Sequence, residues 1–185
     1  MTLPELEHLI THSAFNKNRY EVSIPLKRFN ESLMTYIYDG YDSSDLQSIL
    51  KFGVPEFQRN NDKWSLDMQI KFVENILKGY VTTIQLYILE DDYKKENFNG
   101  CRILDGLQRT TALLSFIEGD FKVFYNSFSF DDLKNTSILK GLNKKVNLEI
   151  FRFDSQNDAI DFYVEMNENI THSKDDILKA LSFKN

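Results

Sequence analysis

The sequence predicts a small α+β protein in which residues 1–185 form a single domain. Hydrophobic residues make up 42% of the chain and charged residues 27%, as in an ordinary globular core. Residues 65–78 have the spacing of an amphipathic helix, and residues 81–89 are rich in the β-branched and aromatic residues of strands. Helix and strand patterns therefore alternate along one chain without repeats or low-complexity tracts.

The elements of the first half are assigned from periodicity and boundary residues. In chain order, we expect a helix at 3–13 inside a peripheral segment at 1–19, a strand at 20–24, a short helix from Ser44 to about Lys51, a helix at 65–78 and a strand at 81–89. Ser44 to Gln47 has the S-x-x-Q form of a capping box. In the helix at 65–78, Ser65 can cap the start and Gly79 takes the position that favours a left-handed residue.

The elements of the second half are assigned in the same way, from periodicity and boundary residues. We expect a strand at 101–104, a helix that ends before Gly119, strands at 121–124 and 146–153, and helices that begin near Ser155 and at 174. The last two helices make residues 154–185 a helical C-terminal part. Four or five strands with about six helices describe a small mixed sheet with helices packed against it.

Charge and cysteine content exclude several classes of protein. The formal net charge is −6, with a sequence pI near 5.1, which is the wrong sign for a broad non-specific nucleic-acid binder. DNA as a partner requires a local basic patch, and the lysine cluster is either a solvated loop or that patch: Lys134, Lys140, Lys144 and Lys145. A single cysteine excludes a disulfide framework and fits the cytoplasm, and no apolar run is long enough to imply a membrane partner.

The segment from Asp105 to Arg109 has the residue types of an anion site. A strand enters a helix through Gly106, and the first N–H groups of a helix have no acceptor inside it. Arg109, one turn into the helix, can bind a phosphate with two donors, while Asp105 can hold a metal ion, orient a water or bind a ribose hydroxyl. Thr110 and Thr111 offer hydroxyl groups. The alternative is that Asp105 caps the helix and Arg109 forms an ordinary ion pair.

This segment resembles the DGQQR motif of the DUF262 family, the N-terminal domain of GmrSD-type restriction enzymes. The central motif D-G-L-Q-R is followed by T-T-A-L-L-S-F. Two flanking blocks resemble the family in the same order. They are Val54 to Arg59 with Trp64 and Phe72 to Gly79 upstream, and Phe162, Met166 and Asn167 with Ile177 and Ala180 downstream. The resemblance implies a ParB/sulfiredoxin-like fold.

The resemblance also implies a function. Members of the family are linked to nucleoside-triphosphate hydrolysis in DNA restriction, and ParB relatives bind CTP. We therefore expect a cytoplasmic domain that binds and hydrolyses a nucleoside triphosphate in restriction, phage defence or counter-defence. By resemblance, Arg59 and Arg109 are phosphate ligands, Asp105 binds Mg²⁺ or positions water, and Gln108 orients water or phosphate. Gln58, Gly106 and Asn167 complete the matched positions.

The sequence departs from the family at several places. Leu107 replaces a glutamine, and Glu168 to Thr171 lacks the glycines of the family's downstream turn. Cys101 is out of register with the reactive cysteine of sulfiredoxins, which argues against sulfinic-acid reduction. We expect a stand-alone short version without the HNH-type nuclease domain of larger relatives.

Two other functions remain open at this point. The same pocket could nick DNA, as a Mg²⁺-dependent endonuclease. Alternatively, the domain could bind a nucleotide or DNA without turnover, as a regulatory or decoy subunit. A second copy of the chain or a nuclease-bearing protein is a further expected partner.

Overall fold

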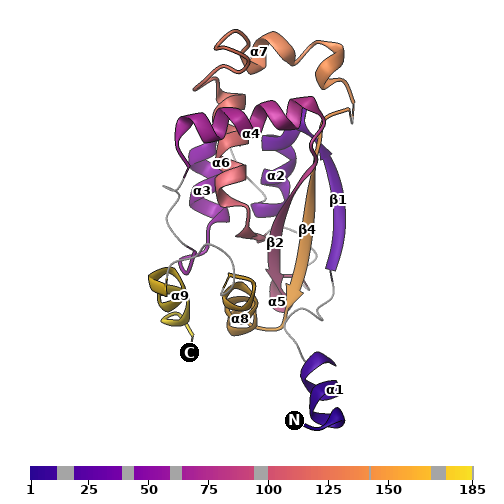
Figure 1. Ribbon diagram of the computed structural model, residues 1–185, viewed down its shortest axis with the longest axis vertical. Coiled ribbons are helices and arrows are strands. Elements are labelled where there is room, and N and C mark those ends of the chain that lie inside the picture. The colour runs from indigo at the N-terminus through magenta and orange to yellow at the C-terminus, as the bar shows by residue number, and fades with distance from the viewer. Residues whose placement is uncertain are drawn as a thin grey trace.

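The computed structural model describes residues 1–11, 19–38, 44–58, 64–93, 100–141, 143–167 and 174–184. Its sheet has four strands in the order β1-β4-β2-β3 (Figure 1), with bounds β1 Arg19–Pro25, β2 Thr82–Leu89, β3 Arg102–Asp105 and β4 Lys145–Phe153. The central pair, β2 and β4, is parallel, and the outer strands β1 and β3 are antiparallel to their neighbours. The prediction of an α+β domain with a mixed sheet is confirmed.

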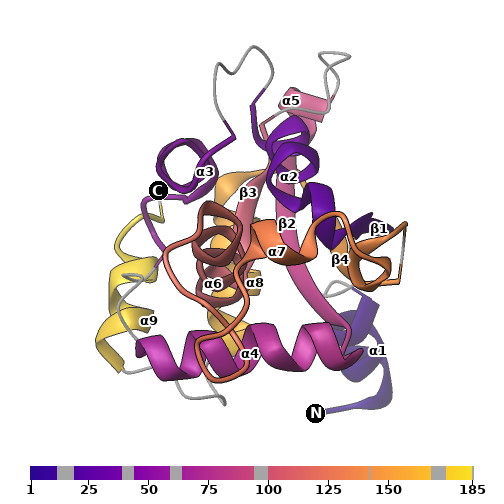
Figure 2. The same ribbon diagram turned by 90° about the horizontal axis from the view of Figure 1, so that it is seen from above.

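The helices surround the sheet on both sides and at one end. Their bounds are α1 Leu3–Thr11, α2 Phe29–Ile37, α3 Leu46–Gly53, α4 Leu66–Lys78, α5 Glu90–Tyr93, α6 Leu107–Glu118, α7 Phe130–Leu133, α8 Gln156–Asn167 and α9 Lys174–Leu181, with 3₁₀ turns η1 Leu26–Arg28 and η2 Ser137–Leu139. Viewed from above, α4 runs across the end of the sheet close to α6 (Figure 2). The helix α1 lies apart from the others at the opposite end (Figure 1).

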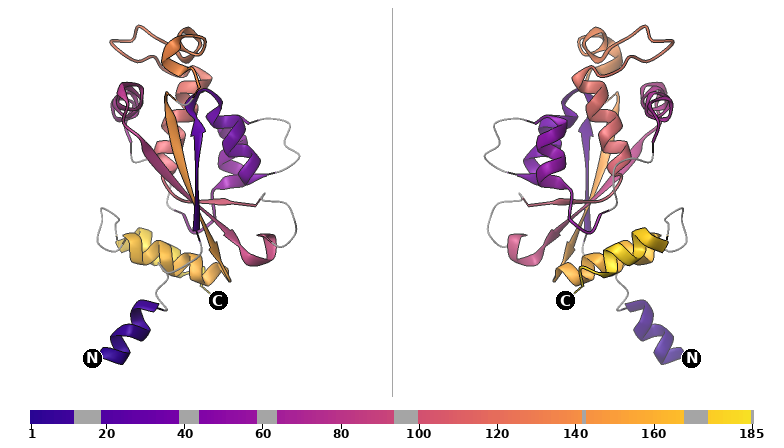
Figure 3. Two further views of the ribbon diagram at one scale, coloured as in Figure 1. Left: turned by 90° about the vertical axis from the view of Figure 1, so that its right-hand side faces the viewer. Right: turned by 90° about the vertical axis from the view of Figure 1, so that its left-hand side faces the viewer.

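Alternation along β2 divides the core into two clusters. Ile84, Leu86 and Ile88 point into a cluster shared with α2, α3, α4 and α6, whereas Tyr87 points into a cluster shared with α8 and α9. Figure 3 shows α2 and α3 on one side of the sheet and α8 and α9 on the other. Both faces of the central strands are therefore covered, which explains why β2 reads as an almost continuous apolar run.

Boundary residues set the ends of the helices largely as the sequence predicts. The Ser65 side chain accepts a hydrogen bond from Met68 N at the start of α4, and Gly79 ends that helix in the left-handed region. At α3, however, the cap is Asp45 rather than Ser44, because the Asp45 carboxylate accepts from Ser48 N at 2.7 Å. A strand was predicted from 146, and β4 begins one residue earlier.

Two assignments needed the tertiary structure. The predicted strand at 121–124 is wrong, because this stretch forms only an isolated bridge between Val123 and Phe128. Phe124 and the two residues after it have positive φ, so the chain turns instead of extending. Conversely, the sequence analysis missed α2, whose buried side chains Phe29, Leu33 and Ile37 follow a helical spacing.

Within the ranges that the structure describes, no helix is both long enough and apolar enough to cross a lipid bilayer.

The second core cluster gives a direct test of the two-sided fold. Phe162 on α8 is 1% exposed and lies 4.7 Å from Phe151 and 5.4 Å from Phe153 between ring centroids. We expect Phe162→Ala to lower the free energy of unfolding by about 3–5 kcal/mol, because it removes a buried ring and leaves a cavity. Urea denaturation measures this loss.

The control is Leu178→Ala on α9, whose side chain is 62% exposed. It should change the free energy of unfolding by no more than about 0.5 kcal/mol. A loss below about 1 kcal/mol for Phe162→Ala would mean that α8 does not cover the sheet.

Candidate functional site

The junction between β3 and α6 carries the D-G-L-Q-R segment. Here β3 ends at Asp105, Gly106 adopts φ 97°, and α6 starts at Leu107. One Asp105 carboxylate oxygen, Oδ1, accepts from Gly106 N at 2.7 Å, and Gly106 O accepts from Thr110 N at 2.8 Å. A carboxylate therefore already occupies the positive end of α6.

Arg109 folds back over this turn. Its Nη1 donates to Thr83 O in β2 at 2.7 Å, and its Nη2 forms an ion pair with Asp105 Oδ2. A Cβ atom on Gly106 would lie 3.3 Å from Arg109 Nε and 3.3 Å from Ile84 Cγ1. Position 106 therefore requires glycine for two reasons. Its φ is positive, and the Arg109 guanidinium occupies the space that a Cβ atom would need. The Arg109 and Asp105 side chains remain 27% and 37% exposed, so solvent reaches the pair.

Gln58 approaches the same junction from the segment after α3. Its side chain is 5% exposed, and Nε2 lies 3.4 Å from both Ile103 O and Leu104 O, the carbonyls that precede Asp105. The Gln58 carbonyl accepts from Lys179 Nζ on α9 at 2.7 Å. The structure thus brings the upstream motif and the helical C-terminal part to the end of β3.

Gln108 joins the junction to the start of α4. It is 7% exposed, and its Oε1 accepts from Trp64 N at 3.2 Å. Residues 59–63 thus lie between Gln58, which binds the end of β3, and Trp64, which binds Gln108 of the D-G-L-Q-R segment. Arg59, predicted as the second phosphate ligand, lies outside the described residues.

Two amide atoms at this junction have no hydrogen-bond partner within the described structure. They are the acceptor Gln58 Oε1 and the donor Gln108 Nε2, and both are fully buried. An unpartnered buried polar atom costs roughly 1–3 kcal/mol unless a water or a ligand completes its hydrogen bond. The junction therefore offers one acceptor and one donor in addition to the ion pair.

The other residues predicted for the site differ in how far they are buried. Thr110 is fully buried and Thr111 half-buried on α6. Asn167 is buried, and its Nδ2 donates to Tyr163 O at 2.6 Å within α8. The turn at Glu168 to Thr171 lies outside the described residues.

The structure describes both Leu107, which replaces the family's glutamine, and Cys101, which is out of register with the sulfiredoxin cysteine. Leu107 is 5% exposed and belongs to the main core cluster, as its place on the apolar stripe predicts. Burial raises the pKa of the Cys101 thiol to about 12, so this cysteine stays protonated at neutral pH and lacks the thiolate that sulfur chemistry needs.

Sequence reasoning missed three groups near the junction. Thr83 contributes only its carbonyl, which no pattern of side chains can reveal. Lys179 lies between Ile177 and Ala180 of the downstream block, and that position was its only signal. The third is Glu149 on β4, which is 8% exposed and binds Arg19 Nη1 at 2.7 Å and Gln85 Nε2 at 2.8 Å. Because Gln85 is in register with Asp105, this buried carboxylate lies in the same cross-strand row.

The described residues contain no group of three or more histidine, cysteine, aspartate or glutamate side chains placed to hold a metal ion. At the junction itself, Asp105 supplies one carboxylate. Such a position suits Mg²⁺, which commonly takes one or two carboxylates together with substrate phosphates and water.

A comparison with protein-family models gives one match. The model described as "GmrSD restriction endonuclease, N-terminal domain" matches residues 37–185, which include Gln58, the β3–α6 junction and Asn167. No curated protein and no solved structure gave a match.

Two glycines allow the backbone and packing roles of the turn to be separated. Gly106 and Gly119 both have positive φ, 97° and 89°, but a Cβ at Gly119 would meet nothing within 4 Å. We expect Gly119→Ala to lower the free energy of unfolding by about 1 kcal/mol, from backbone strain alone. Gly106→Ala should cost about 2–3 kcal/mol, because the new methyl group also crowds Ile84 and Arg109. Equal losses in urea denaturation would contradict the close packing of Arg109 over the turn.

Proposed function

Because the chain belongs to the GmrSD restriction endonuclease N-terminal domain family, we propose that it binds a nucleoside triphosphate at the β3–α6 junction. We further propose that it hydrolyses this nucleotide, with Mg²⁺, in a DNA-directed restriction or defence process. The observation that carries the proposal is the partly exposed Asp105–Arg109 ion pair at the start of α6, together with two buried amide atoms, Gln58 Oε1 and Gln108 Nε2, that have no hydrogen-bond partner among the described residues.

Phosphate binding would proceed by an exchange of partners. A phosphate group carries more negative charge than a carboxylate and matches the guanidinium with two parallel hydrogen bonds. It can therefore take the place that the Asp105 carboxylate holds against Arg109 and the positive end of α6. Arg109 keeps its hydrogen bond to Thr83 O during the exchange, which holds the guanidinium in place.

The two glutamines provide the remaining polar contacts. After a side-chain movement that exposes this buried atom, Gln108 Nε2 can donate to a phosphate oxygen, while its Oε1 stays bound to Trp64 N. Gln58 Oε1 can accept a hydrogen bond from a water or a ribose hydroxyl. Arg59 follows Gln58 directly in the sequence, and Lys179 adds a positive charge at the Gln58 carbonyl. Ligand binding would thus satisfy groups that are costly to bury alone.

The exchange releases Asp105 for catalysis. Once Arg109 binds phosphate, the Asp105 carboxylate is available to coordinate Mg²⁺ or to orient the attacking water. The bound Mg²⁺ would neutralise charge on the phosphates. In the hydrolysis step, the water oxygen bonds to the γ-phosphorus, and the bond from that phosphorus to the β–γ bridging oxygen breaks. The nucleoside diphosphate leaves with the electron pair of that bond, and the attacking water gives up a proton to a phosphate oxygen. Positioning and charge neutralisation dominate this chemistry, and Arg109, Asp105 and the α6 amides supply both.

Thermal stability in the presence of nucleotides tests binding. We expect at least one of ATP, GTP, CTP and UTP, with Mg²⁺, to raise the melting temperature of the wild-type protein. At ~100 times its Kd a ligand stabilises by about 2.7 kcal/mol, or roughly 5–10 °C for a domain of this size. Arg109→Ala should abolish the rise, because it removes the phosphate contact.

A matched control for Arg109→Ala is Arg152→Ala. Arg152 is also a partly buried arginine in a carboxylate pair, with Glu90 Oε2 at 2.9 Å, but it lies at the far end of β4. The control should keep the full rise in melting temperature. No response of the wild type to any nucleotide, or an equal loss in both variants, would contradict the proposal.

Asp105→Asn separates binding from turnover. The amide keeps the shape of the side chain but no longer competes as an anion for Arg109, so we expect nucleotide affinity without Mg²⁺ to stay equal or rise. Release of inorganic phosphate should fall by at least ~100-fold, because the metal- or water-positioning carboxylate is lost. Calorimetry measures the affinity and a phosphate-release assay the turnover. Unchanged turnover would leave the junction as a binding site only, and plasmid nicking by the wild type would favour the nuclease alternative.

A further inference from the structure

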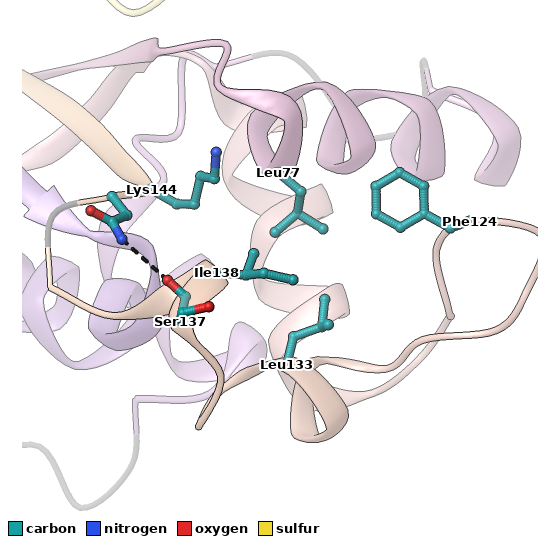
Figure 4. A pocket seen from close by; sticks show the side chains of 7 residues that line it. Leu77, Phe124, Leu133, Ser137, Ile138 and Lys144 are labelled. Atoms are coloured by element: carbon teal, nitrogen blue, oxygen red, sulfur yellow. Dashed lines mark hydrogen bonds between the residues drawn. The ribbon is translucent and has the colours of Figure 1, made fainter.

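A surface separate from the β3–α6 junction lies at the end of the molecule formed by α4, α7 and the start of β4. It surrounds a hollow of about 440 Å³ that involves none of the junction residues. Figure 4 shows Leu77, Leu133 and Ile138 pointing toward one another across the hollow, with Phe124 on one side and Lys144 on the other. Ser137 and Asn143 also line it, joined by a hydrogen bond of 3.1 Å from Asn143 Nδ2 to Ser137 O. The floor is therefore apolar and part of the rim polar.

One lysine, Lys144, lines this hollow, and two more, Lys78 and Lys140, lie close in the chain to the lining residues Leu77 and Ile138. Within the described structure, Lys140 and Lys144 form no ion pair, and the Lys144 ammonium lies 3.9 Å from the position of a Cβ on Gly79. Lys78 Nζ lies 5.5 Å from the centroid of the Phe124 ring. Lys140 and Lys144 therefore leave uncompensated positive charge on this side of a protein whose net charge is −6, and an anionic partner would compensate it.

The acidic side chains nearby have structural tasks of their own. Asp132 closes a capping box with Ser129 at the start of α7, and Asp131 pairs with Lys134 at 2.8 Å. Glu74 accepts from Phe124 N at 2.9 Å and lies 3.8 Å from Lys78 Nζ. These carboxylates therefore hold the surface in shape and do not neutralise Lys140 or Lys144.

The turn at 124–126 begins at Phe124, which lines the hollow, and presents an aromatic ring to solvent. Phe124, Tyr125 and Asn126 all have positive φ, from 51° to 60°, which costs non-glycine residues free energy. The Phe124–Glu74 hydrogen bond and the Val123–Phe128 bridge hold this conformation. As a result Tyr125 is completely exposed, at 101% of its reference area. Exposed aromatic side chains combined with basic residues are what proteins use to bind unpaired nucleic-acid strands.

We propose that this surface, defined by Lys78, Tyr125, Lys140 and Lys144 around the hollow, binds an unpaired stretch of nucleic acid. The strand phosphates lie against the lysines, one base stacks on Tyr125, and a neighbouring base enters the hollow against Leu77 and Ile138. Ser137 and Asn143 offer hydrogen bonds to the edge of that base. An acidic peptide would use the lysines but would leave the exposed ring and the apolar floor without a partner. The surface is independent of the proposed nucleotide site.

The test is fluorescence anisotropy with a labelled 15-nucleotide single strand of mixed sequence, at several salt concentrations. We expect the wild-type protein to bind the strand, and the logarithm of its association constant to fall linearly with the logarithm of the salt concentration. The double variant Lys140→Ala/Lys144→Ala should reduce the slope by about 1.4, since each lost phosphate contact on a single strand contributes about 0.7. Tyr125→Ala should weaken binding on the order of tenfold and leave the slope unchanged, because stacking is not ionic.

The matched control is Lys51→Ala on α3. Lys51 is also an exposed lysine near an aromatic ring, since its Nζ lies 5.0 Å from the centroid of the Phe52 ring. It should leave affinity and slope unchanged. Melting temperatures of all variants confirm that they are folded. An absence of binding, an unchanged slope in the double variant, tighter binding of the matching duplex, or equal displacement by polyglutamate would overturn the proposal.

Discussion

The proposed chemistry depends on one ion pair, between Asp105 and Arg109, held across a single glycine where β3 passes into α6. The pair puts a carboxylate where an anionic ligand would bind and turns the guanidinium toward the same point. In this state the two charges of the pair compensate each other. A phosphate that competes for Arg109 must bind it more strongly than the Asp105 carboxylate does. Once the phosphate has displaced that carboxylate, Asp105 is free to bind a metal ion or a water. The same interaction therefore accounts both for the stability of the unliganded turn and for the proposed coupling of binding to catalysis.

The rest of the fold keeps this pair in place while leaving it accessible. The carbonyl of Thr83 fixes the guanidinium from the central strand β2, and Gln58 fixes the end of β3 through the carbonyls of Ile103 and Leu104. Helices on both faces bury the sheet, yet the two charged side chains stay about one-third exposed. Rigid surroundings and partial exposure are what an exchange of ligands requires, because the guanidinium stays oriented while its partner changes.

Much of this arrangement is predictable from sequence because it is local. The cap at Ser65, the left-handed Gly79 and the strand–glycine–helix junction at Gly106 each depend on a few neighbouring residues. The partners of Arg109 were harder to predict. The sequence analysis allowed an ordinary ion pair for Arg109 but did not name Asp105 as its partner, and Thr83 O is a backbone atom of a distant strand. The error at 121–124 has the same origin. Its apolar residues serve the core, but hydrogen bonds to Glu74 and Phe128 bend the chain where its composition favours a strand.

The central claim is that phosphate and Asp105 compete for Arg109. A crystal structure of the protein with a non-hydrolysable nucleoside triphosphate and Mg²⁺ tests it most directly. The account predicts phosphate oxygens within hydrogen-bond distance of the Arg109 guanidinium and the Asp105 carboxylate turned away from it, toward the metal. A bound nucleotide with the Asp105–Arg109 pair intact and the phosphates elsewhere would contradict it.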